Sequence, residues 1–145
     1  PEHVFGDIKS FLSPGPLQQL AEMEHRGVTV SLPALVPLMK SRRAVNTCAW
    51  CIKHQRYCEH PRAKIHQGSP ACTDMGQMGD RAGIDGSTMQ DFATWCALRR
   101  ALKEPFTLLE ESDAFKEETI ELMLGDTHLI EGGVLDSLDF GFADR

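Results

Sequence analysis

The sequence has no long apolar run, no internal repeat and no low-complexity segment. No stretch approaches the roughly 20 apolar residues that a membrane-spanning helix needs, so we expect no membrane segment. The five cysteines are an odd number and no signal-peptide pattern is seen, which argues against a disulfide framework and favours reduced thiols in an intracellular compartment. The net charge of -6 argues against nucleic-acid binding by bulk electrostatics alone.

The composition is otherwise that of an ordinary globular protein, with 41% hydrophobic and 25% charged residues. A chain of 145 residues has room for one domain with a real core. Charge is distributed unevenly, because the segment from Lys40 to Lys64 is basic and the last third is acidic. The basic segment either meets phosphates or is simply a solvated face.

The pattern from Lys64 onward predicts an α/β protein. A strand, a Gly/Ser/Pro-rich loop, a helix and a second buried strand follow one another, which is βαβ organisation with a parallel sheet. Ser87 and Gln90 match a capping box at the start of the helix. The predicted strands are 3–8, 64–67, 106–110 and segments near Thr127 and Val134, and the predicted helices are 16–26, a stretch from Ser31, 87–103 and 113–124.

A dense group of potential metal ligands interrupts the first half of the chain. Three cysteines and two histidines fall within the thirteen positions 48–60. Thiolates and imidazole are the ligands of structural zinc sites, so Cys48, Cys51, Cys58 and His60 are our candidates, in an insertion at about 46–62. The alternative is a set of unliganded thiols near a helix end.

Three further residues are candidates for a site at the ends of strands. Gly68-Ser69-Pro70 makes a rigid approach to Cys72, whose thiolate could attack an electrophilic carbon. Glu110 ends the predicted strand 106–110, and adjacent parallel strands share one edge. Asp7 likewise ends the first predicted strand. The plainer interpretations are a buried cysteine, an acidic start of the next helix and a turn aspartate.

In order and spacing, these segments resemble the catalytic core of DNA (cytosine-5) methyltransferases. The matching stretches are Phe5-Gly-Asp-Ile8, Gly68-Ser-Pro-Ala-Cys72, Gly79-Asp-Arg-Ala-Gly83, Leu108-Leu-Glu-Glu111 and Asp139-Phe-Gly-Phe-Ala-Asp-Arg145. The sequence departs from the family where Ala71 separates Pro70 from Cys72, where Glu111 replaces asparagine and where Asp144 replaces glutamine. We therefore expect a divergent chain that represents the middle of a catalytic domain.

The resemblance implies a Rossmann-like fold that uses S-adenosylmethionine and acts on DNA. It implies that Cys72 attacks C6 of a flipped cytosine, that Glu110 holds and protonates N3, and that Arg145 lies near both. It also implies that Asp7 and Ile8 contact the adenine of the cofactor. A DNA substrate would place a eukaryotic protein of this kind in the nucleus.

Two other readings remain open from the sequence. One is a non-catalytic homologue that keeps the fold and binds nucleic acid or zinc through Lys40 to Lys64. The other is a small zinc-stabilised interaction module whose Cys72 loop matches the family by chance.

Overall fold

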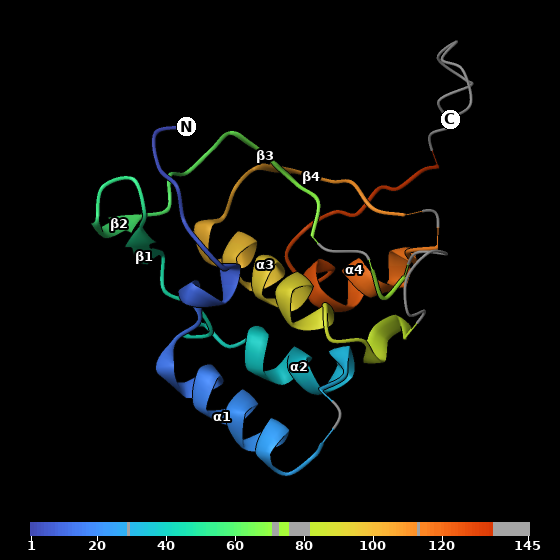
Figure 1. Ribbon diagram of the computed structural model, residues 1–145. Helices are drawn as coiled ribbons and strands as arrows, with labels where there is room; N and C mark the ends of the chain where they lie inside the picture. The colour runs from blue at the N-terminus through green and yellow to red at the C-terminus, as the bar shows by residue number, and fades with distance from the viewer. Residues whose placement is uncertain (29, 71–72, 76–81, 113, 135–145) are drawn as a thin grey trace.

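The computed structural model of the protein describes residues 1–28, 30–70, 73–75, 82–112 and 114–134 (Figure 1). This part of the chain is an α/β structure with four helices and two small two-stranded sheets, and the sheets lie at the edges of the group of helices. Its helices are α1 (Pro14–His25), α2 (Leu32–Met39), α3 (Met89–Leu102) and α4 (Glu117–Leu124), with 3-10 turns η1 (Ile8–Phe11) and η2 (Gly83–Asp85). Its strands are β1 (Cys48–Cys51), β2 (Arg56–Glu59), β3 (Ile65–Gly68) and β4 (Phe106–Leu109).

Helix α3 is the central element, and almost every residue along it is buried. It packs against α2, α4 and η1, and the strands β3 and β4 cross above it in Figure 1. Its first turn carries Asp91 and its last turn Arg99 and Arg100, charges that suit the helix dipole. It ends at Lys103, whose φ of 53° is in the left-handed region. The predicted helix 87–103 is therefore confirmed to within two residues at each end.

The start of α3 is held by a residue outside the helix. The carboxylate of Asp74 accepts hydrogen bonds from the backbone N–H of Thr88 at 2.6 Å and from its Oγ1 at 2.5 Å. No side-chain cap comes from the helix's own N-cap residue. Gly86 leaves the space for this, because a Cβ there would lie 2.0 Å from the Asp74 carboxyl carbon. The cap is thus supplied by the preceding loop rather than by the predicted Ser87–Gln90 box.

Strands β3 and β4 form a parallel pair joined through α3, which confirms the predicted βαβ unit. Ile65 lies opposite Phe106 and Gly68 opposite Leu109. Among the described residues this sheet has two strands, and the strand predicted near Thr127 is wrong, whereas the one predicted near Val134 extends outside the described residues. Thr127 instead forms a turn, because its backbone N–H donates to the carbonyl of Leu124 at the end of α4.

The Cys/His-rich segment forms an antiparallel hairpin, β1 with β2, at the left edge of Figure 1. The predicted strand 3–8 is wrong in extent, because only Phe5 bridges to Cys51 on β1. Asp7 then caps η1 by accepting a hydrogen bond from the backbone N–H of Lys9 at 2.8 Å. Its carboxylate therefore begins a helical turn and does not end a sheet strand.

Helices α1 and α2 lie below α3 in Figure 1 and complete the core. Leu20 from α1 and Leu32, Leu35 and Met39 from α2 are buried with the apolar face of α3. Both helices start after a serine with proline in the first turn: α2 follows Ser31 as predicted, while α1 begins at Pro14, two residues before the predicted start. None of the helices in the described ranges is long and apolar enough to cross a membrane.

A buried ion pair ties the end of α3 to the strand pair. Arg99 donates from Nη1 to Oε2 of Glu104 at 2.5 Å, and the two side chains are 1% and 0% exposed. The other carboxylate oxygen accepts a bond from the backbone N–H of Ala63, just before β3, at 3.4 Å. Glu104 therefore joins the end of α3, the start of β4 and the approach to β3.

We expect Glu104→Gln to destabilise the fold by about 3–5 kcal/mol, because it leaves the Arg99 charge buried without its counter-charge. The adjacent Arg100 offers a matched control, since its partner Asp126 is 49% exposed. Asp126→Asn should cost at most about 1 kcal/mol. Urea unfolding followed by circular dichroism measures both values, and equal losses in the two variants would contradict this assignment.

Candidate functional site

The ends of β3 and β4 bring two of the predicted segments together. Ser69 follows β3 and Glu110 follows β4, and the backbone N–H of Glu110 donates to the carbonyl of Gly68 at 3.1 Å. The Ser69 hydroxyl donates to Oε2 of Glu110 at 2.7 Å. This hydrogen bond is solvent-exposed, so the Glu110 carboxylate faces outward at the strand ends while one of its oxygens is fixed.

Trp95 sets how closely α3 approaches this edge. A Cβ on Gly68 would lie 2.4 Å from Nε1 of Trp95, so only glycine fits between strand and helix there. The guanidinium carbon of Arg99 lies 5.7 Å from the Trp95 ring centroid, within cation–π range. The buried Arg99–Glu104 ion pair thus helps to hold the Trp95 ring in place against Gly68.

A cavity of about 330 Å³ lies between these strand ends, α3 and η1. One polar atom of a lining residue, Nε1 of Trp95, is buried and has no hydrogen-bond partner among the described residues, whereas Oδ1 of Asp91 lies 3.6 Å from the Lys9 ammonium. Such unpartnered atoms are costly unless a ligand or water satisfies them. The cavity is lined by Ile8, His66, Gly68, Ser69, Pro70, Asp91 and Trp95.

Burial controls the charge of two groups near the strand ends. Burial and, next to it, the Arg99 charge together lower the pKa of His66 to about 4, against the opposing effect of the Glu104 carboxylate. His66 is therefore neutral at neutral pH. Burial also raises the pKa of Glu111 to about 7, with the Glu110 charge adding to the effect against a backbone hydrogen bond from Ser112. The half-buried carboxyl of the acidic pair is thus Glu111.

The predicted catalytic and cofactor residues divide into three groups. Cys72 and Arg145 lie outside the described residues, so their positions are not part of this geometry. Glu110 lies at the strand ends and Ile8 lines the cavity, which brings these two segments to one region. Asp7 does not line the cavity, and its carboxylate lies 3.5 Å from the Lys9 ammonium.

A second group of side chains gathers on the inner face of the hairpin. One ligand atom from each of His3, Cys51, His54 and Cys58 lies within 4.8 Å of every other. Nδ1 of His54 is 3.5 Å from Sγ of Cys51 and 3.5 Å from Sγ of Cys58. These four residues, here called the Cys/His cluster, could hold a metal ion.

The chemistry of Cys51 suits a ligand role. Burial raises the pKa of its thiol, but hydrogen bonds from the backbone at Val4 and His54, and the nearby His3 ring, outweigh burial and lower the pKa to about 6. A large thiolate fraction at neutral pH follows.

Two of the predicted ligands lie away from the cluster. Cys48 is exposed, because alternation along β1 points Ala49 and Cys51 inward and Cys48 outward. The His60 ring stacks on Phe5 with centroids 5.8 Å apart, and its Nδ1 lies 3.0 Å from the carbonyl of Pro61. In the structure, His54 and His3 complete the cluster in place of the predicted Cys48 and His60. His54 is one of the two histidines within positions 48–60, but the predicted set used His60 instead. No local sequence pattern indicates His3, which is distant along the chain.

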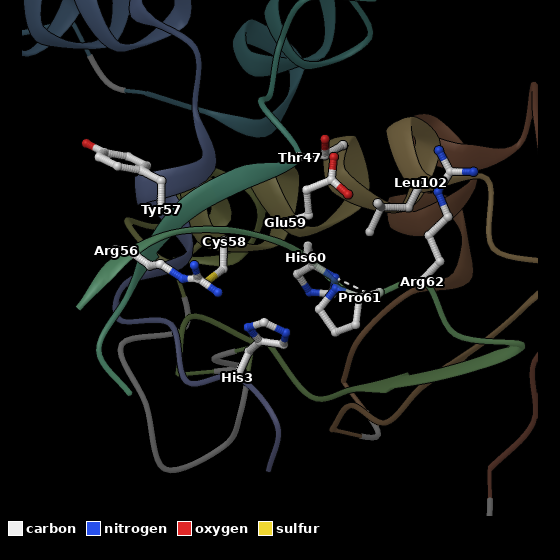
Figure 2. A pocket seen from close by; sticks show the side chains of 10 residues that line it. All are labelled: His3, Thr47, Arg56, Tyr57, Cys58, Glu59, His60, Pro61, Arg62 and Leu102. Carbon is white, nitrogen blue, oxygen red and sulfur yellow. Dashed lines mark hydrogen bonds between the residues drawn. The ribbon is translucent and has the colours of Figure 1, made fainter. Parts of the chain in front are cut away.

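A larger cavity of about 520 Å³ opens beside the hairpin. Figure 2 shows His3 and Cys58 at one side of it and His60, Pro61 and Arg62 at the other. Arg56 also lines it, so part of the basic Lys40–Lys64 segment surrounds this opening.

Comparison with known proteins adds no family to this description. No protein-family model matches the chain, and neither a curated protein nor a solved structure shows significant similarity to it.

The raised pKa of Glu111 predicts a defined pH dependence. A carboxyl whose pKa rises from its ordinary 4.5 to about 7 on folding is bound to a proton more tightly in the folded state. Its contribution to stability is therefore lost as the pH rises from about 4.5 to about 7. Glu111→Gln mimics the protonated form, so its stability relative to the wild type should increase across this window and level off above it.

Urea unfolding at a series of pH values measures this difference. Glu121→Gln, an exposed change on α4, is the matched control and should show no such trend. A constant difference between Glu111→Gln and the wild type from pH 4.5 to 7 would contradict the burial of Glu111.

Proposed function

We propose that this chain is part of the catalytic core of a DNA cytosine-5 methyltransferase with a Rossmann-like fold. The observation that carries the proposal is the Ser69–Glu110 hydrogen bond across the ends of the parallel strands β3 and β4. It joins the segment that leads to Cys72 to the segment that carries the base-recognising glutamate, two segments whose order and spacing resemble the family's. The proposal rests on the residues at the ends of β3 and β4 and not on similarity of fold.

The proposed reaction uses Cys72 as the nucleophile and Glu110 as the acid. The Cys72 thiolate attacks C6 of the cytosine, which forms an S–C6 bond and breaks the C5–C6 double bond. Glu110 donates a proton to N3, and the electron pair moves to C5. After C5 has gained a methyl group, a base removes the C5 proton, the double bond forms again as the thiolate leaves, and N3 returns its proton to Glu110.

Ser69 has a positioning role in this scheme. Its hydroxyl holds Oε2 of Glu110 at 2.7 Å, which fixes the orientation of the carboxyl toward an incoming base. The target base must leave the helical stack to reach this edge, because C6 is covered by its neighbours in a duplex. Arg56 and Arg62, which line the larger cavity, are suited to nearby DNA phosphates.

The cavity beneath the strand ends has features that fit the adenine of S-adenosylmethionine. Its volume of about 330 Å³ lies near the lower limit for small-molecule pockets. Ile8 and Trp95 provide apolar walls, and the unpartnered Nε1 of Trp95 offers a hydrogen-bond donor. We assign Ile8 to contact the adenine, while Asp7 caps η1 and lies outside the lining of this cavity. When bound, this cofactor supplies an electrophilic methyl group.

Covalent trapping on DNA that contains 5-fluorocytosine tests the proposal. Fluorine at C5 cannot leave as a cation, so the thiolate adduct should persist in the presence of S-adenosylmethionine and survive denaturing electrophoresis. We expect this chain to be inactive on its own; in the full-length protein that contains it we expect an adduct in the wild type, none in Cys72→Ser, and at least a tenfold slower rate in Glu110→Gln, the order expected for loss of a general acid.

Cys48→Ser and Glu121→Gln are the matched controls, since both residues are exposed and distant from the strand ends, and both variants should form adduct as the wild type does. An adduct that persists in Cys72→Ser, or its absence from the folded full-length wild type, would reject the methyltransferase assignment.

A further inference from the structure

We propose that the Cys/His cluster of His3, Cys51, His54 and Cys58 is a structural zinc site that fastens the start of the chain to the β1–β2 hairpin. This proposal does not depend on the methyltransferase assignment, because it rests on the four side chains alone. It differs from the set predicted from sequence in two of its four ligands.

The distances agree with zinc coordination. Zinc–sulfur bonds of about 2.3 Å and zinc–nitrogen bonds of about 2.0–2.1 Å at tetrahedral angles place a nitrogen and a sulfur about 3.5 Å apart. Both distances from His54 Nδ1 to the thiol sulfurs are 3.5 Å. All four ligand atoms lie within 4.8 Å of one another, so the four groups already surround one point and would move closer together around a bound ion.

Hydrogen bonding alone leaves this arrangement incomplete. A ring nitrogen carries either one proton or one lone pair. Nδ1 of His54 can therefore form a full hydrogen bond with only one of the two thiols. Nδ1 of His3 is buried and has no hydrogen-bond partner within the described ranges. A metal ion at the centre would accept electron pairs from all four groups, which resolves both problems.

The surroundings are those of a closed structural site. Four protein ligands complete a tetrahedron and leave no open position for a substrate. Cys51 and Cys58 are buried on the inner face of the hairpin. The other nitrogen of His3, Nε2, lies 3.9 Å from the Glu2 carboxylate, in the position of the outer carboxylate that often orients a metal-bound histidine.

The ion would cross-link two distant parts of the sequence. Three ligands come from the hairpin, and His3 comes from the opening segment. Backbone contacts already align that segment, since Phe5 bridges Cys51 and Ile52 N–H donates to the Val4 carbonyl at 2.7 Å. Because η1 begins directly after this segment, the zinc site also fixes Ile8 at the edge of the smaller cavity.

Metal analysis of protein purified under reducing conditions without chelator tests the site. The wild type should carry about one zinc per chain, and cobalt substitution should give the strong visible absorption of a tetrahedral site with thiolate ligands. Cys51→Ser and Cys58→Ser should lose the zinc, and His3→Ala should weaken it at least tenfold. Cys48→Ser, a change at a cysteine of the same hairpin, should keep the full amount.

The cobalt spectrum of the wild type decides the matter even if a ligand variant fails to fold. Substoichiometric zinc with no tetrahedral cobalt spectrum would overturn the proposal. So would zinc lost in Cys48→Ser but kept in Cys58→Ser, or a Cys51–Cys58 disulfide in the native protein. None of these readouts requires methyl transfer, so the zinc site and the proposed reaction stand or fall separately.

Discussion

The buried pair of Arg99 and Glu104 is the interaction on which the arrangement of the described residues depends. It joins the last turn of α3 to the start of β4, while the second oxygen of Glu104 holds the approach to β3 through Ala63. Two charges removed from water are stable only when they are paired and hydrogen-bonded, so this contact permits little variation in how strands and helix meet. The register of β3 against β4, and with it the pairing of Ser69 with Glu110, follows from that constraint.

A row of aromatic and imidazole rings extends this constraint to the hairpin. Trp95 lies against Gly68 at one end, and His54 meets His3 in the Cys/His cluster at the other. Successive ring centroids along the row are 5.0 to 6.2 Å apart. The rings between these ends belong to Phe5, His60 and His66. A zinc ion at one end and an ion pair at the other would therefore stabilise the same row of packed side chains.

The sequence predicted those elements whose signals are local. The helix from Met89, the two strands around it and their parallel pairing follow from turn residues and apolar runs, and the structure has them. The extent of the first strand could not be predicted, because a single bridge between Phe5 and Cys51 depends on the tertiary placement of the hairpin. The set of candidate metal ligands differs from the predicted one for a related reason. A Cys-x-x-Cys pair suits a turn, but in a strand residues three apart face opposite sides, so Cys48 points outward. The contribution of His3 depends on a contact across the chain that no local pattern encodes.

The most direct test of the proposed chemistry is the exchange of hydrogen at cytosine C5 with solvent. Attack by a thiolate at C6 together with protonation at N3 makes C5 nucleophilic, so C5 should take up a solvent proton and release its own hydrogen even when no methyl donor is present. The experiment measures tritium released to water from DNA labelled at cytosine C5. The proposal predicts release by the full-length wild type and none above background by Cys72→Ser. Equal release by both proteins, or none by the folded full-length wild type, would contradict the assignment of these strand ends to cytosine activation.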